Sequence, residues 1–357
     1  MQLTKQRTLA ALLLAALMAA SLPVFAQQTF NTTIYLDWSQ FMSRDGFRTA
    51  DQKSSFFAFR RAYFTYENKV NDKLKFRFRF DADDTSNLTS INVDFPSETV
   101  STKKDDKLRP YIKHLYLEYS NLLPNSSIKV GMADTLTFKP AEDRWGYRSV
   151  AKTLMDGYKD VTGVEIDATS ADIGASLTGS LTKYFRYGFM ITNGAHYSHA
   201  ENDKYKKLMF QGQVVPLPGL SLVGYLDYEK QDAANSAVTY KVDAFIEMIS
   251  NLTVGGEWFV YRNDRNLVAD RRSDSSGFSF FGRYTLDPDK LAFFARFDRY
   301  EPNNLVAENE ISLAIIGVDW APFHKSWKLQ PNVWYYDYAD PSKKRDLVFN
   351  LTFFLSL

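Results

Sequence analysis

Alternation with a period of two residues is the feature that most constrains the fold of this chain. From Lys73 to Asp81, every second side chain is apolar and those between are charged. Because successive side chains of a β-strand point to opposite faces of the sheet, this run predicts a strand with one apolar and one charged face. In water the apolar face would need a core, and in a membrane barrel it would meet lipid while the charged face lined the lumen.

The same alternation recurs along the chain up to Leu357. Seventeen segments show it, and the weakest is Val161 to Ala168. A closed bacterial barrel has an even number of strands, so we place this segment in a connection. The sixteen strands are then predicted over residues 30–42, 55–68, 73–83, 110–120, 126–134, 172–181, 184–193, 206–216, 220–231, 237–249, 252–263, 276–286, 290–300, 309–320, 327–339 and 345–357.

The predicted connections alternate between short and long. Turns such as Asn71-Asp72 and Pro218-Gly219 carry turn-forming residues. The long connections are polar and cover residues 43–54, 84–108, 135–171, 194–204, 264–275 and 301–308. This layout predicts an all-β fold, a 16-stranded antiparallel transmembrane β-barrel. A soluble β-sandwich or jelly roll is the alternative, but it does not explain the strict alternation of short and long connections.

The longest predicted connection is the third long loop, residues 135–171. A sixteen-stranded barrel has a lumen wide enough for an aqueous channel, and a long loop that folds inward would narrow it. We expect this loop to fold inward, with Trp145 and Tyr147 anchoring it on the inner wall and Arg144 and Arg148 among its basic residues. The alternative is an extracellular loop of balanced charge.

The first residues have the order of a secretory signal peptide. Lys5 and Arg7 precede an apolar stretch over residues 8–22, and Val24-Phe25-Ala26 fits a cleavage site. We therefore expect residues 1–26 to be a cleaved signal peptide and residues 27–357 a single barrel domain. The expected location is the bacterial outer membrane. The alternative is a buried N-terminal helix.

Composition removes several classes of site and partner. The chain has no cysteine, which excludes disulfides, thiolate metal sites and cysteine nucleophiles. The formal net charge is +1, so no general attraction to nucleic acid is expected. The 21 Tyr, 28 Phe and 6 Trp residues suit strands and membrane interfaces.

Basic side chains gather on the second and third predicted strands. A row of guanidinium groups in a narrow pore attracts anions and can bind phosphate or carboxylate with two hydrogen bonds. Which of Arg60 and Arg61 faces the lumen depends on turn geometry and stays open. The alternative is a mixed-charge wall whose cations pair with Glu67, Asp81 or Asp83. The candidate lumen-lining and anion-binding residues are Arg60, Arg61, Lys75, Arg77, Arg79, Arg144, Arg148 and Arg186.

Signals for catalysis or metal binding are weak. His114 lies among strand serines, but no spacing supports a catalytic triad. His196 and His199 lie three residues apart on a predicted loop, where solvated side chains are the simpler interpretation. We therefore predict no catalytic residue, no metal and no cofactor.

Several short motifs resemble the phosphate-selective porin O and P family. These are FFAFRRAYFTYENKVNDKLKFRFRFD (56–81), LYLEYS (115–120), IKVGMADTLTF (128–138), WGYRSVAKTLMD (145–156), ADIGASLTGS (171–180) and YGFMITNG (187–194). The resemblance covers most of the chain in layout, but specific residues only from about 55 to 195. It implies a trimeric, anion-preferring porin with loops folded into the channel. The basic positions it carries over are Arg60, Arg61, Arg77, Arg79, Arg144 and Arg148.

The chain departs from this family in two respects. Many acidic side chains alternate with the basic ones on the strands, which argues against a dedicated phosphate channel. The last residue is Leu357, where outer-membrane barrels more often end in Phe.

The expected function is passive diffusion of small hydrophilic solutes, with a preference for phosphate-like anions. The expected partners are outer-membrane lipid and lipopolysaccharide, small anionic or polar solutes, and two further copies in a homotrimer. The alternatives are a barrel enzyme of the lipase or protease type and a structural barrel without an open pore.

Overall fold

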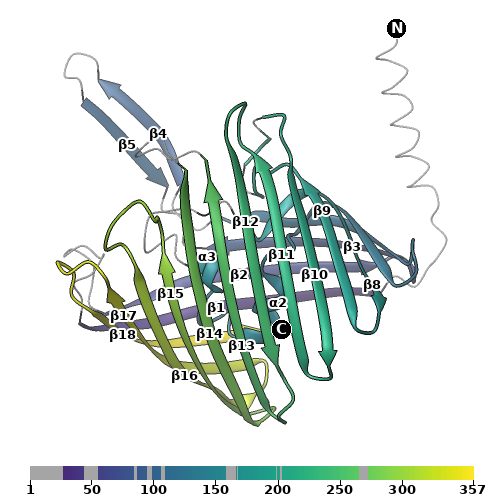
Figure 1. Cartoon of the computed structure of the whole chain (residues 1–357). Helices are drawn as coiled ribbons and strands as arrows, with labels where there is room; N and C mark the ends of the chain where they lie inside the picture. The colour runs from purple at the N-terminus through teal and green to yellow at the C-terminus, as the bar shows by residue number, and fades with distance from the viewer. Residues whose placement is uncertain are drawn as a thin grey trace.

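The computed structural model describes residues 27–43, 55–83, 87–94, 99–105, 109–157, 166, 168–197, 199–201, 203–264 and 272–357. The predicted signal peptide lies outside these residues. Sixteen strands form one closed antiparallel barrel (Figure 1). The barrel strands are β1 (Gln27–Ser43), β2 (Ser55–Lys69), β3 (Leu74–Asp83), β6 (Tyr111–Ser120), β7 (Ser126–Asp134), β8 (Ala171–Thr182), β9 (Phe185–Thr192), β10 (Lys207–Leu217), β11 (Leu220–Lys230), β12 (Ser236–Ile246), β13 (Leu252–Asn263), β14 (Ser273–Asp287), β15 (Leu291–Glu301), β16 (Ile311–His324), β17 (Trp327–Tyr338) and β18 (Asp346–Ser356).

The strand order follows the sequence around the ring. Each strand pairs with the next barrel strand along the chain, and the ring closes where β1 pairs with β18, with Thr33 opposite Ser356. The predicted number of strands is therefore confirmed. All sixteen predicted strands are present, and their predicted ends lie within four residues of the observed ends.

The structure corrects one predicted connection. Residues 84–108 were expected to form a plain polar loop, but they contain β4 (Asn87–Asp94) and β5 (Thr99–Asp105), which pair as a separate two-stranded sheet. These strands lack the long apolar alternation of the barrel strands, so the sequence pattern did not reveal them. Of the segment Val161 to Ala168, only residues 166 and 168 are described, and neither lies in a strand.

The two faces of the barrel wall differ as the alternation predicted. On β12, Tyr240 and Val242 are 41% and 49% exposed, whereas Lys241 and Asp243 between them are each 1% exposed. The same contrast holds on β15, where Phe293 and Phe297 are exposed and Arg296 is buried. An apolar outer face and a charged inner face are what a barrel needs when it stands in lipid.

Two short helices lie between β7 and β8. Helix α2 (Lys139–Trp145) has Pro140 in its first turn and ends at Gly146, whose φ of 73° is left-handed. Proline suits the first turn and glycine the left-handed position after the last turn, so the local sequence fixes both ends. Helix α3 is Leu154–Gly157. Among the described residues, no helix is long and apolar enough to cross a membrane.

The apolar core lies where these helices meet the inner wall. Trp145 and Leu154 are fully buried and belong to one cluster with Phe245, Phe259 and Phe294 of β12, β13 and β15. The buried aromatic side chains of these strands are thus covered by residues that follow β7. The barrel wall and the segment after β7 (residues 135–157) share one core.

Candidate functional site on the inner face of the barrel

A β-bulge in β2 places two adjacent arginines on the inner face. Tyr35 of β1 lies opposite Arg61 and Leu36 lies opposite Phe59, which leaves Arg60 as the extra residue. Arg60 pairs with Asp37, which is buried on the inner face of β1. Both arginines therefore face the inside, and this answers the question that the sequence left open.

A second bulge does the same in β6. Arg79 of β3 lies opposite His114 and Phe80 lies opposite Ile112, so Lys113 is the extra residue. Lys113 and His114 are 4% and 1% exposed. The two bulges together place two pairs of consecutive basic residues on the inner wall, one pair on β2 and one on β6, and these two strands flank β3. Lys113 was not among the predicted site residues.

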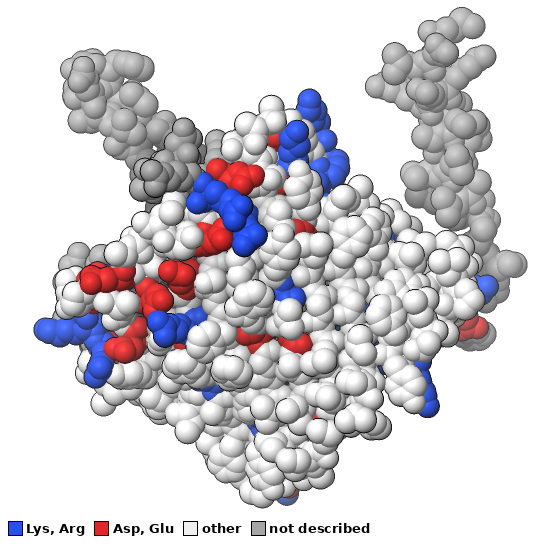
Figure 2. All heavy atoms as spheres, in the orientation of Figure 1, with Lys and Arg blue, Asp and Glu red and all other residues white. Residues whose placement is uncertain are grey.

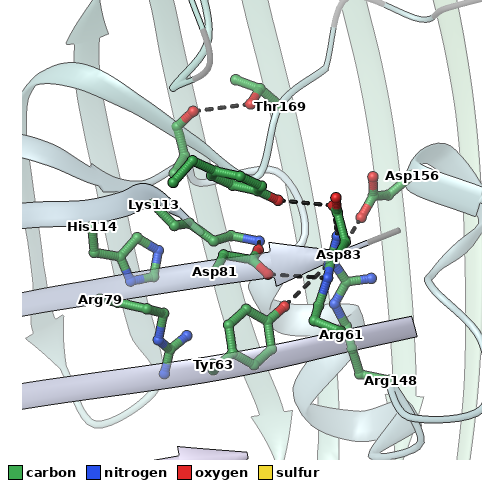
Figure 3. Close-up of polar contacts among 12 residues, drawn as sticks. Arg61, Tyr63, Arg79, Asp81, Asp83, Lys113, His114, Arg148, Asp156 and Thr169 are labelled. Atoms are coloured by element: carbon green, nitrogen blue, oxygen red, sulfur yellow. Dashed lines mark hydrogen bonds and ion pairs between the residues drawn. The ribbon is translucent and has the colours of Figure 1, made fainter. Parts of the chain in front are cut away.

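Three cations of the inner wall surround the ring of Tyr63 on β2 (Figure 3). The distances to its centroid are 4.8 Å from Arg79 Cζ, 5.3 Å from Lys113 Nζ and 5.6 Å from Arg61 Cζ. Arg61 also donates a hydrogen bond of 3.2 Å to the Tyr63 hydroxyl. The negative face of an aromatic ring attracts cations, so Tyr63 helps to hold three of them at close range.

Carboxylates balance most of this positive charge. Arg61 lies 3.3 Å from Asp81 and 3.0 Å from Asp83, and Lys113 lies 3.1 Å from Asp81. Towards the other end of β3, Lys75 and Arg77 both pair with Glu67, at 3.2 and 3.5 Å. These pairs are the ones that the mixed-charge alternative requires. The wall is therefore a network of ion pairs rather than a ladder of free cations.

Arg79 differs from the other cations of this network. Its Nε donates a hydrogen bond of 2.8 Å to Thr65 Oγ1, and its guanidinium stacks on Tyr63. Within the described part of the chain, no carboxylate lies within 4 Å of it. The terminal nitrogens of Arg79 therefore remain the donors that a solute anion could use.

The segment after β7 follows the inner wall around much of the barrel. Gln211 of β10 donates to the Leu136 carbonyl, and Thr137 donates a hydrogen bond of 2.8 Å to the Tyr225 hydroxyl of β11. Trp145 packs edge-on against Phe281 of β14, with centroids 5.6 Å apart. All these partners lie on the face that carries the buried charged residues. Residues 158–165 and 167 are not described, so the inward folding of the third loop as a whole stays a prediction.

Three polar contacts fix the next part of the segment. Arg60 of β2 donates a hydrogen bond of 2.8 Å to the Val150 carbonyl, and Arg296 of β15 donates to the Lys152 carbonyl. Ser149 donates a hydrogen bond of 2.6 Å to Gln330 Oε1 of β17, which lies between those strands in the ring. Two backbone carbonyls of the segment thus accept hydrogen bonds from arginines, one on β2 and one on β15.

Arg148 adds a further cation from the segment. It pairs with Glu142 at 3.0 Å and with Asp156 at 3.1 Å, and it lies within electrostatic reach of Arg61 and Tyr63 (Figure 3). Burial raises the pKa of the Glu142 carboxyl above its ordinary value even though Arg148 opposes the shift. The pKa of Asp156 is lowered, because Lys152 and Arg148 together outweigh its burial.

The remaining predicted residues are spread over the wall. Arg144 lies 3.6 Å from Glu247 and over the ring of Phe245, away from the Tyr63 cluster. Arg186 is the second residue of β9 and is exposed. The structure thus brings Arg60, Arg61, Arg79 and Arg148 together and leaves Arg144 and Arg186 outside this group.

Two arrangements can be checked among the described residues, a triad around His114 and a cluster of metal ligands. His114 Nε2 lies 2.8 Å from Asp134 Oδ1, but no serine of the described residues donates a hydrogen bond to the ring, as a serine hydrolase would require. No group of three or more His, Cys, Asp or Glu side chains among those described is placed to hold a metal ion.

Comparison with known proteins relates the chain to solved structures. No protein-family model and no curated protein matches the sequence. The anion-selective porin from Comamonas acidovorans superimposes with a TM-score of 0.67 at 9% identity, covering 93% of this chain and 100% of that one. For the outer membrane channel DcaP of Acinetobacter baumannii, the TM-score is 0.62 at 11% identity, with 93% and 97% covered.

A third structure has the same extent of overlap. OmpT of Vibrio cholerae, described as expressed in the outer membrane, gives a TM-score of 0.59 at 11% identity and covers 93% of this chain and 98% of its own. Identities this low relate folds and not activities. The resemblance to the phosphate-selective family is not confirmed by these matches. What they do show is that the chain has the closed sixteen-stranded fold of outer-membrane porins.

Proposed function

We propose that the protein is a porin of the bacterial outer membrane, through which small hydrophilic solutes diffuse passively. The observation that carries this proposal is the division of the wall into an apolar outer face and a charged inner face around a closed sixteen-stranded barrel. The porins among the similar structures support the same interpretation. The expected homotrimer belongs to the proposal, and one similar OmpT structure is described as a trimer form.

We also propose that the channel prefers anions such as phosphate. Most cations of the inner wall have carboxylate partners, so the preference depends on those with donors to spare. Arg79 is the strongest of these, because among the described residues only Thr65 and Tyr63 engage its guanidinium. A single unpaired cation at a narrow point gives a moderate preference, in contrast to a dedicated phosphate channel.

In this proposal the segment after β7 narrows the lumen beside Arg79. Its cation Arg148 and its acids Glu142 and Asp156 would then form the wall opposite β2 and β3. A solute that passes this point would meet charges of both signs. Small polar solutes are the substrate class that such a mixed constriction admits.

Planar bilayers test both parts of the proposal. The purified protein should give stepwise conductance in potassium chloride, and under a salt gradient the reversal potential should have the sign of anion preference. A potential of the opposite sign would refute the anion preference and leave the porin intact. Folded protein that never conducts would refute the porin and favour the structural barrel.

A further inference from the structure

Two glycines lie opposite each other on the outer face of the barrel. Gly212 of β10 pairs with Gly224 of β11, and both belong to the face that carries exposed apolar side chains. A Cβ atom added at either position would meet no atom within 4 Å. The wall is therefore hollowed where two neighbouring strands both lack a side chain.

Bulky apolar side chains border this hollow. It has a volume of about 910 Å³ and reaches from β9 to β13. Its sides are formed by outward-facing residues that are between 38% and 49% exposed: Phe189, Phe210, Leu226, Tyr240, Val242 and Trp258. An open hollow of this kind suits a flexible hydrocarbon chain, since the surface that lines it is mostly apolar.

The charge on this face is confined to one end. On the outward faces of β9 to β13, as far as these strands are described, the charged residues are Lys230 and Arg262, both cations. Both lie at the end where the long connections begin. Figure 2 looks onto this face and shows its middle almost free of charged side chains, which gather along the upper edge.

Arg262 borders the hollow itself and reaches that edge. Its guanidinium lies over the ring of Tyr240 at 5.5 Å, and its Nε is 3.4 Å from Asp274. Asp274 is shared with Arg272 at 3.5 Å, so the three side chains carry a net charge of +1. From Trp258 to Arg262 along β13 is about 13 Å at the usual rise of a strand. An apolar trough with a cation at one end complements an amphiphile that has an anionic head.

We propose that this hollow binds an acyl chain of lipid A, the anchor of lipopolysaccharide, with a lipid A phosphate at Arg262. The inference rests on the proposed outer-membrane location, in which the long connections face outward. The cationic end then lies in the outer leaflet, where lipid A is the phosphorylated lipid. A second copy of the chain fits the hollow less well than lipid A. Close packing of two copies would bury Arg262 and Lys230 together without bringing further carboxylates to pair with them.

Filling the hollow provides the first test. Delipidated protein in detergent is titrated with lipid A, and bound lipid is counted by native mass spectrometry. Gly224→Leu should weaken binding about tenfold, because its side chain displaces roughly two methylenes of the lipid. Gly282→Leu is the matched control. Gly282 is also on the outer face, and a Cβ there meets only the Thr253 carbonyl at 3.9 Å.

Removing the cation provides a second test that leaves the trough intact. Arg262→Gln should also weaken lipid A binding about tenfold, since a charge-assisted contact to phosphate is lost. Arg299→Gln is its control, because Arg299 is an exposed outward arginine of β15 with Glu310 as its partner. With fully dephosphorylated lipid A, Arg262→Gln and the unchanged protein should bind equally.

Three results would overturn the inference. Lipid A binding could be unchanged in both Gly224→Leu and Arg262→Gln. Phosphatidylglycerol could bind as tightly as lipid A, which would assign the hollow to phospholipid. Gly224→Leu could dissociate the oligomer, which would assign it to a subunit contact. Conductance in bilayers free of lipid A tests the channel separately, so failure of this site leaves the porin untouched.

Discussion

The Arg60 guanidinium donates a hydrogen bond of 2.8 Å to the backbone carbonyl of Val150. It joins a bulged residue of β2 to a segment ninety residues later in the chain. A second arginine, Arg296, donates to the Lys152 carbonyl from β15, five strands away around the ring. Two strands of the wall thus hold one short piece of backbone, and the bulge in β2 is what brings Arg60 within reach.

We predict that loosening these contacts widens the proposed channel. In Arg60→Gln combined with Arg296→Gln, two hydrogen bonds from charged donors are lost, each worth about 1.5–3 kcal/mol. Single-channel recordings should show larger and noisier conductance than in the unchanged protein. Arg299→Gln, on the outer face, serves as the control. Conductance steps identical to those of the control would mean that residues 149–152 do not limit the flow.

The position of the segment can be measured directly because the chain has no cysteine. The Ser149 and Gln330 side chains are joined by a hydrogen bond of 2.6 Å. Ser149→Cys with Gln330→Cys should therefore cross-link with a short bismaleimide reagent in the folded protein. Ser149→Cys with Leu329→Cys is the control, because Leu329 is on the opposite face of β17. Equal cross-linking of both pairs would contradict the contact.

The strands were predictable because one physical signal determines them. A strand between lipid and lumen must alternate, so residues such as Phe76 and Arg77 mark both the strand and its faces. The short turns then fixed the pairing of neighbours. The hairpin of β4 and β5 escaped because it stands outside the barrel and has no alternation to detect.

The site was less predictable, because it depends on irregularities in that signal. Phe59 and Ala62 lie on the outer face with two residues between them instead of one, and so do Ile112 and Leu115. This break in the two-residue alternation is visible in the sequence. It would have indicated both bulges and the inward-facing position of Lys113. The partners of the loop residues have no such signal. The contact of Trp145 with Phe281, for example, depends on how the segment lies against the inner wall.

Arg79 is the residue whose loss should change ion selectivity most. In Arg79→Gln the side chain keeps a donor for Thr65 but loses its charge. At about 4 Å in water a unit charge is worth about 1 kcal/mol, so the anion-to-cation permeability ratio should fall about fivefold. Reversal potentials in a salt gradient measure this ratio.

Arg61 supplies a comparison for the same experiment. It has two carboxylate partners, so Arg61→Gln removes a cation from both Asp81 and Asp83 and should reduce anion preference too, with a loss of stability that Arg79→Gln does not share. If Arg79→Gln left the reversal potential unchanged while Arg61→Gln altered it, the spare donors of Arg79 would not be the source of the preference.

Trp145 should be the most sensitive apolar position of the segment. It is fully buried, packs against Phe281, Phe294 and Tyr147, and donates a hydrogen bond of 2.9 Å to the Ala151 carbonyl. Trp145→Ala should lower the stability of the packed segment by about 3–5 kcal/mol, because the substitution leaves a large cavity. Protease accessibility of residues 135–157 in detergent reports this loss. Trp258→Ala, on the outer face, should leave the accessibility unchanged.

The carboxyl of Asp156 should stabilise the segment at neutral pH. Its pKa is lowered by Lys152 and Arg148, so the ionised form is the one that the folded segment favours. The resulting stability is present above the ordinary aspartate pKa of 3.8 and is lost as the pH falls. Asp156→Asn should therefore increase protease accessibility at pH 7, and the difference from the unchanged protein should shrink towards pH 3.

Glu142 should behave in the opposite way although it contacts the same arginine. Its pKa is raised by burial, so the folded segment favours the protonated form, and this stability is lost as the pH rises above the ordinary glutamate pKa of 4.5. Glu142→Gln keeps the neutral form at every pH, so at pH 7 it should protect the segment at least as well as the unchanged protein does. Below pH 4 the two proteins should become equal. Parallel pH profiles for Asp156→Asn and Glu142→Gln would show that Arg148 does not distinguish its two partners.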